Sequence, residues 1–109
     1  MAVILYASAS PFSAKVRMAA AWCGVSAESR IVDTNIQSGE LTDANPLGKI
    51  PVFITEDGKA IFDSRTITQH LNRVSGSVLF PRNADRRLQV EQLEALADGV
   101  SDCLVAYAY

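Results

Sequence analysis

The sequence is poor in the residues that build metal centres and disulfide frameworks. Its 109 residues include one histidine, His70, and two cysteines, Cys23 and Cys103, which are far apart and form no Cys-x-x-Cys motif. A zinc site, a disulfide framework and a dithiol redox centre are therefore not expected, and we predict no metal. Two unpaired thiols fit a reducing compartment, so the sequence predicts a cytoplasmic protein.

The sequence also lacks a run of basic residues and a long apolar segment. Ten Lys and Arg residues against twelve Asp and Glu residues leave a net charge of -2, and Arg86–Arg87 is the only basic doublet. No segment approaches the ~20 apolar residues of a membrane span. Met1–Tyr6 is too short for the apolar region of a signal peptide. We therefore expect no nucleic-acid partner and no membrane partner.

What the sequence does contain is the element order of a small α/β domain followed by a long helix. Apolar and β-branched runs predict strands over Val3–Tyr6, Ser29–Val32, Val52–Thr55 and Ala60–Phe62. Helical spacing predicts helices over Pro11–Cys23, Ser38–Ala44 and Ser64–Val74. The order βαβ, short helix, ββα predicts a four-stranded mixed sheet with helices on both faces, which is the thioredoxin-like arrangement.

The last segment, Asn83–Tyr109, is expected to form one long amphipathic helix. Its apolar stripe consists of Leu93, Leu96, Ala97, Val100, Leu104 and Tyr107. Its acidic residues, which favour other faces, are Asp85, Glu91, Glu94, Asp98 and Asp102. No later element covers the stripe, so the helix either opens an all-α domain whose remainder is missing or packs against a second copy. We favour the first interpretation.

Three segments resemble motifs of the N-terminal domain of cytosolic glutathione transferases. Ser10–Arg17 is similar to the strand-to-helix active-site loop of that family, Asn45–Val52 to its turn that binds the glutathione backbone, and Asp63–Arg65 to its γ-glutamyl motif. Asp85–Val105 resembles the first helix of the all-α second domain. The resemblance covers the whole chain and is nearest to small bacterial members with a serine in the active-site loop.

The resemblance implies a division of the chain into three parts. Residues 1–76 would form a thioredoxin-like glutathione-binding domain, residues 77–83 a linker, and residues 84–109 the first helix of a truncated all-α domain. Further helices of the family line the pocket for the second substrate. The resemblance therefore carries over glutathione recognition but does not identify the electrophile.

The resemblance also implies a function. The intact protein would bind glutathione as its co-substrate and conjugate the thiolate to small electrophiles, as a homodimeric detoxification enzyme without a metal. Two alternatives stay open. One is a non-enzymatic protein-binding module, as in stringent starvation protein A and the gamma subunits of elongation factors, and the other is a glutathione-dependent peroxidase. The complete set of peptide-binding residues favours the transferase, because a pure scaffold needs no such set.

Ile50–Pro51 is the first expected point of glutathione contact. Proline makes a cis peptide bond accessible at ~0.5–1 kcal/mol, and the resemblance implies that this bond is cis. A cis bond at a strand entrance turns the Ile50 backbone outward, so its N–H and C=O can pair with the cysteinyl residue of glutathione like an added strand. The alternative is a trans proline that begins an edge strand.

The second expected contact is the start of the helix at Ser64. Its hydroxyl and the free N–H groups beyond it would bind the γ-glutamyl carboxylate, while Asp63 would neutralise the α-ammonium group. The alternative is that Asp63 and Ser64 only cap the helix. Lys49 is expected to meet the glycine carboxylate unless it is a solvated lysine, and Gln37 is a further candidate at that end.

Ser10 is the catalytic candidate. A thiol with a pKa near ~8.5 is mostly protonated at neutral pH. A hydroxyl that donates to sulfur at the positive end of a helix would favour the thiolate. Ser8 and Tyr6 remain alternative thiolate stabilisers, and Ser10 could also serve only as the cap of the helix that follows it.

Overall fold

The computed structural model describes residues 1–33 and 39–108. Its strands are β1 (Ala2–Tyr6), β2 (Ala27–Ile31), β3 (Val52–Ile54) and β4 (Ala60–Ile61). Its helices are α1 (Pro11–Trp22), α2 (Gly39–Ala44), α3 (Ser64–Val74) and α4 (Ala84–Ala108). The predicted order of elements is confirmed, and so is the long C-terminal helix. The boundaries that can be compared differ by two residues at most, with the largest difference at the start of β2. The predicted first residue of the short helix, Ser38, and the predicted last residue of the long helix, Tyr109, lie outside the described residues.

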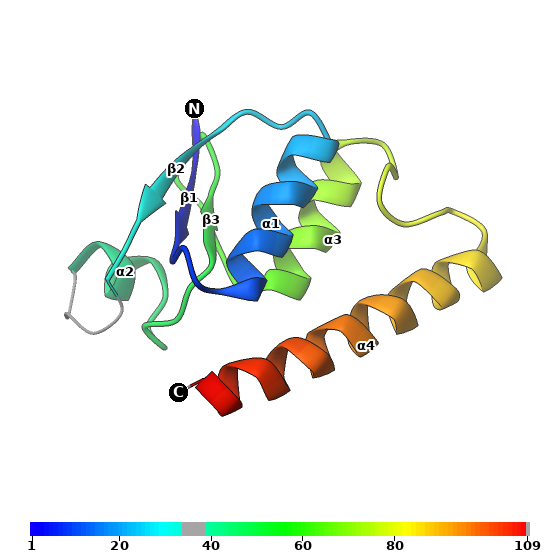
Figure 1. Ribbon diagram of the computed structural model, residues 1–109. Coiled ribbons are helices and arrows are strands. Elements are labelled where there is room, and N and C mark those ends of the chain that lie inside the picture. The colour runs from blue at the N-terminus through cyan, green and yellow to red at the C-terminus, as the bar shows by residue number, and fades with distance from the viewer. Residues whose placement is uncertain (34–38, 109) are drawn as a thin grey trace.

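The sheet has the strand order β2-β1-β3-β4. Strand β1 runs parallel to β2, with Tyr6 opposite Ile31, and antiparallel to β3, with Ile4 opposite Phe53. Helices α1 and α3 lie side by side on one face of this sheet, and α2 lies on the other (Figure 1). The structure therefore has the predicted mixed sheet between two layers of helices, the thioredoxin-like fold.

The core is split by the sheet into two apolar clusters. The cluster under α1 and α3 contains Ala2, Ile4, Val16, Ala19, Ala20, Phe53, Ile67 and Leu71. The cluster on the α2 side contains Leu5, Val32, Leu41 and Val52. Because β1 is covered on both faces, successive residues such as Ile4 and Leu5 are both buried, which explains its uninterrupted apolar sequence.

Helix α1 begins and ends with local signals of the expected kind. The Ser10 hydroxyl accepts the backbone N–H of Ser13, and Pro11 occupies the first helical position, where a missing N–H costs nothing. At the other end Gly24 has a φ of 69°, a left-handed conformation that glycine adopts without strain. The cap places Ser10 at the positive end of the α1 dipole.

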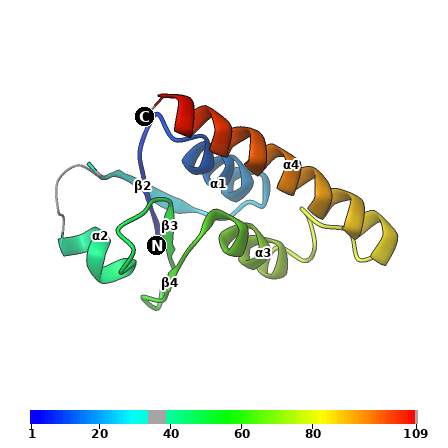
Figure 2. The same cartoon turned by 90° about the horizontal axis from the view of Figure 1, so that it is seen from below.

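Helix α4 lies across the ends of α1 and α3 rather than beside the sheet (Figure 2). Its apolar side chains Leu93, Leu96, Val100 and Leu104 are between 54% and 66% exposed, whereas Asp98 is only 6% exposed. The face that meets the rest of the molecule is thus acidic, and the apolar stripe points to solvent. None of the helices in the described part of the chain is long and apolar enough to cross a membrane.

Candidate functional site

A cleft of about 940 Å³ lies at the carboxyl ends of the parallel strands β1 and β2. In open α/β sheets this edge is the usual place for a ligand. The predicted site residues that line the cleft are Ser10, Lys49, Ile50, Pro51, Asp63 and Ser64. Three segments that are far apart in sequence therefore meet in one place. Gln37, the remaining candidate, lies outside the described residues.

The turn before Pro51 is built around the side chain of Asn45, which is 2% exposed. Its amide nitrogen donates to the Lys49 carbonyl at 3.0 Å, and its amide oxygen accepts the Leu47 N–H at 3.0 Å. Gly48 has a φ of 64° within this turn. The Ile50–Pro51 peptide bond that follows is cis, and both residues face the cleft.

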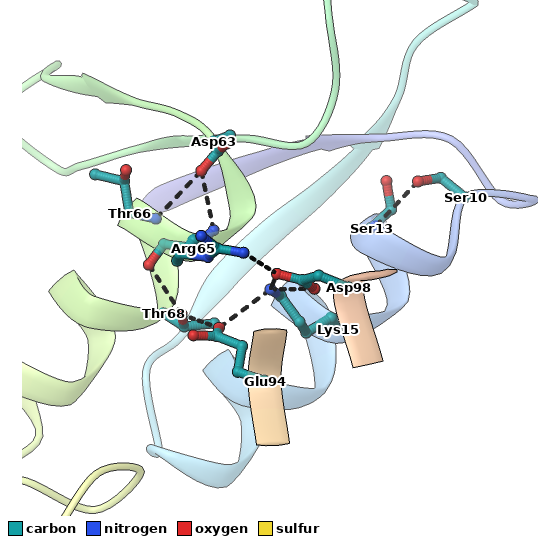
Figure 3. A network of polar contacts seen from close by, with 9 residues as sticks. All are labelled: Ser10, Ser13, Lys15, Asp63, Arg65, Thr66, Thr68, Glu94 and Asp98. Atoms are coloured by element: carbon teal, nitrogen blue, oxygen red, sulfur yellow. Dashed lines mark hydrogen bonds and ion pairs between the residues drawn. The ribbon is translucent and has the colours of Figure 1, made fainter. Parts of the chain in front are cut away.

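Helix α3 begins at Ser64, as predicted. Asp63, not Ser64, is the N-cap, and its Oδ1 accepts the N–H groups of Arg65 at 3.1 Å and Thr66 at 3.5 Å (Figure 3). Ser64 is the first residue of the helix and is 5% exposed. Within the described part of the chain, neither its backbone N–H nor its hydroxyl has a hydrogen-bond partner.

The loop between β1 and α1 places Ser10 on the opposite side of the cleft. The Ser10 hydroxyl accepts the Ser13 N–H at 3.1 Å, and its backbone N–H donates to the Ala7 carbonyl at 3.2 Å. The hydroxyl of the buried Ser13 accepts the Ala7 N–H at 3.3 Å. These bonds hold the loop in one conformation and direct Ser10 toward the cleft.

The two competitors of Ser10 are placed differently. Ser8 also lines the cleft. Tyr6 does not, because its ring packs against the apolar cluster under α1 and α3, with the Arg17 guanidinium 4.2 Å from its centroid. His70 is also outside the cleft, and the centroid of its ring lies 5.7 Å from that of Phe53. Burial lowers the pKa of His70, and the positive charges of Arg73 and Lys59 lower it further.

Helix α4 also lines the cleft, through Asp98, Asp102 and Val105. Asp98 is held by two cations: Lys15 Nζ lies 2.9 Å from its Oδ1, and Arg65 Nη2 lies 3.4 Å from its Oδ2. Lys15 also pairs with Glu94 Oε2 at 3.1 Å, and the Thr68 hydroxyl donates to the same oxygen at 2.7 Å (Figure 3). This network joins α4 to α1 and α3.

Comparisons with known proteins show the family to which this chain belongs. The model of the family described as Glutathione S-transferase, N-terminal domain, matches residues 9–74, which is more than half of the chain. The chain belongs to this glutathione S-transferase family. Within the matched span lie the Ser10 loop, the Ile50–Pro51 turn and the start of α3.

Solved glutathione S-transferase structures resemble this chain in sequence and fold. A glutathione S-transferase from Methylobacillus flagellatus with bound glutathione is 37% identical with a TM-score of 0.89, over 97% of this chain and 53% of that one. A glutathione transferase family member from Pseudomonas fluorescens with bound glutathione is 31% identical with a TM-score of 0.82, over 97% of this chain and 54% of that one.

Among curated relatives, the probable glutathione S-transferase BZ2 of Zea mays is 37% identical over 90 residues, covering 72% of this chain and 37% of that protein. The uncharacterized GST-like protein YibF of Escherichia coli is 42% identical over 59 residues, covering 53% of this chain and 29% of that protein. This family member thus spans about half the length of the similar solved chains, and less of the curated relatives.

Two features of this glutathione S-transferase cleft were not predicted from its sequence. One is the α4 wall, and the other is Arg65, which enters the cleft beside Ser64. The spacing of Glu94 and Asp98, four residues apart, places them on one helix face, but the cations opposite them come from distant segments. Across the residues that the structure describes, no group of three or more His, Cys, Asp or Glu side chains is placed to hold a metal ion.

Proposed function

We propose that this cleft binds glutathione and that the intact protein is a glutathione transferase, which conjugates the glutathione thiolate to small electrophiles. The observation that carries this proposal is the meeting of Ser10, Ile50–Pro51 and Ser64 in a single cleft. Two similar family members, from Methylobacillus flagellatus and Pseudomonas fluorescens, have been solved with glutathione bound.

The peptide backbone of glutathione would lie along residues 49–51. Ile50 is half-buried beside Pro51, at the entrance to β3, and an extended peptide that pairs with its backbone adds to the sheet in the manner of β-augmentation. Lys49 is exposed at the cleft edge and is the cation proposed to meet the glycine carboxylate, with Gln37 as a further contact at that end.

The γ-glutamyl end would lie at the start of α3. The Ser64 N–H and hydroxyl are proposed to bind its carboxylate, at the positive end of the helix dipole. Asp63 uses its Oδ1 for the Arg65 and Thr66 N–H groups, so its Oδ2 is proposed to accept the α-ammonium group. Capping and ligand binding are thus compatible in this pair of residues.

Ser10 is the proposed thiolate stabiliser. A hydroxyl group has one proton to donate and two lone pairs to accept with. The Ser13 N–H donates to one lone pair of the Ser10 oxygen, and this bond does not use the Ser10 proton. The proton can therefore be donated to the sulfur of glutathione. A hydrogen bond to the charged form, at the N-terminal end of α1, favours the thiolate over the thiol.

The organisation of the whole protein is also proposed on the family pattern. Residues 1–76 are the glutathione-binding domain, residues 77–83 a linker, and residues 84–109 the first helix of an all-α domain. We propose that the intact enzyme is a homodimer that acts in detoxification in the cytoplasm. The two free cysteines are compatible with that reducing compartment.

A titration of this chain with reduced glutathione, followed by heteronuclear NMR, tests the proposal. We expect saturable shifts at Ser10, Ile50 and Ser64. A Ser64→Ala variant should bind at least about tenfold more weakly, since hydrogen bonds to charged groups are worth about 1.5–3 kcal/mol. The matched control is Ser75→Ala at the other end of α3, which should bind as the parent does. A folded spectrum that does not respond to millimolar glutathione would contradict the proposal.

A further inference from the structure

The cleft extends past the residues proposed to bind glutathione. The residues proposed to bind the peptide part of glutathione, from Lys49 to Pro51 and from Asp63 to Ser64, make up only part of the cleft lining. Ser10 is proposed to hold the sulfur, and further lining comes from Ser8, Phe12 and α4. Clefts of roughly 300–1,000 Å³ hold drug-sized ligands, so a volume of about 940 Å³ leaves space for a substituent on the glutathione sulfur.

The direction of that substituent follows from the position of Ser10. The hydroxyl proposed to hold the sulfur belongs to the first residue before α1, and the C-terminal half of α4 passes beside the start of α1 (Figures 1 and 2). These two helices line the cleft through Phe12 of α1 and through Asp98, Asp102 and Val105 of α4. Asp98 is held beside the start of α3 by Arg65, whereas among the described residues no such contact holds Asp102 and Val105. A group on a sulfur held by Ser10 would therefore enter the part of the cleft that Phe12, Asp102 and Val105 line.

Asp102 is the charged residue of this set, and its charge is not compensated. Within the described part of the chain it has no side-chain hydrogen bond and no ion pair. The neighbouring Asp98, one helical turn earlier, is paired with both Lys15 and Arg65. Lys49, the other cation that lines the cleft, is the residue proposed to meet the glycine carboxylate of glutathione.

We propose that Asp102 is a selectivity residue that makes the cleft favour cationic electrophiles and disfavour anionic ones. The inference rests on the proposed glutathione site. An unpaired carboxylate near the sulfur attracts a positively charged group on the substituent and repels a negatively charged one. Because Asp102 is exposed, water and salt screen the interaction, and the preference is moderate and strongest at low ionic strength.

The test uses S-alkyl glutathiones of equal chain length whose terminal group is an ammonium, a methyl or a carboxylate. We expect the affinity of this chain to fall in that order, with about tenfold between the ammonium and carboxylate conjugates at low salt. Asp102→Asn should bring the ratio close to one, and Asp102→Lys should reverse the order. Asp85→Asn, at the other end of α4, is the matched control and should leave the ratio unchanged.

The outcomes separate the two proposals. If the three conjugates bind with equal affinity, or if Asp102→Asn leaves their ratio unchanged, the selectivity role is wrong while the glutathione site stands. If neither reduced glutathione nor any conjugate binds, the glutathione site itself is wrong, and the role of Asp102 is wrong with it.

Discussion

The Ser10 hydroxyl caps α1 by accepting the Ser13 N–H with an oxygen lone pair, whereas thiolate stabilisation would use its proton. One hydroxyl group can therefore do both. Capping by a side-chain oxygen contributes about 1 kcal/mol to helix stability. Donation to a thiolate would instead be visible only when glutathione is bound. The two roles can therefore be separated by substitutions that keep one and remove the other.

Replacing Ser10 by Ala should raise the pKa of the bound glutathione thiol by about one pKa unit. A shift of one unit corresponds to about 1.36 kcal/mol, and a hydrogen bond to a charged group is worth about 1.5–3 kcal/mol. The thiolate absorbance of the complex, followed against pH, measures this change. Ser10→Asp provides the control, because aspartate caps a helix but cannot donate a hydrogen bond when ionised.

We expect Ser10→Asp to restore the thermal stability lost in Ser10→Ala without restoring the low thiol pKa. An unchanged thiol pKa in both variants would remove Ser10 from the proposed mechanism. In that case Ser8, the other serine that lines the cleft, becomes the candidate.

The α3 start shows how far single residues could be predicted from the sequence. The sequence predicts a helix that begins at Ser64, and α3 does begin there, but the sequence does not say which of Asp63 and Ser64 supplies the capping oxygen; in the structure it is Asp63. Both residues are good N-caps, so their intrinsic preferences do not decide between them. The choice depends on how the preceding strand enters the helix, which is a property of the assembled sheet.

At the scale of elements, local signals predicted the strands and helices well. Pro11 marks the beginning of α1 and Gly24 follows its end. Asp57–Gly58 forms the turn between β3 and β4, in which the Gly58 N–H donates to the Thr55 carbonyl. The inward face of α4 was not predicted, because acidic residues on a helix normally face solvent. Its burial depends on Lys15 and Arg65, which are distant in sequence and can be placed only in three dimensions.

The buried network between α4 and α1 predicts a large effect of Lys15. Lys15 Nζ pairs with the buried carboxylates of Glu94 and Asp98. Removing one partner of a buried pair costs about 3–5 kcal/mol when burial is complete. Because Lys15 remains partly accessible and Arg65 still contacts Asp98, we expect Lys15→Met to lower the free energy of unfolding by about 2 kcal/mol.

Denaturant unfolding measures this loss, and Arg30→Met is the matched control. Arg30 Nη1 lies 2.7 Å from Glu40 Oε2, closer than Lys15 is to either carboxylate, but on the exposed surface. Exposed pairs contribute about 0–1 kcal/mol. An Arg30→Met variant as destabilised as Lys15→Met would show that burial does not decide the strength of these pairs here.

At the scale of the whole molecule, α4 has two faces with different consequences. The acidic face is covered by α1 and α3 through Lys15 and Arg65 and closes one wall of the cleft. The opposite face exposes Leu93, Leu96, Val100 and Leu104. Apolar side chains in a continuous stripe on one helix are typical of an interaction surface rather than of scattered surface residues.

This exposed stripe predicts that the 109-residue chain associates with itself. Packing two such stripes together removes apolar surface from water at about 25 cal/mol per Å². We expect the mass measured by light scattering to rise with protein concentration, and Leu96→Glu to keep the chain monomeric.

Met18→Glu is the control, because Met18 is also exposed but lies on α1, away from the stripe, so this variant should associate as the parent does. A parent chain that stays monomeric at millimolar concentration would contradict the prediction, and a Leu96→Glu variant that associates as the parent does would place the contact outside the α4 stripe.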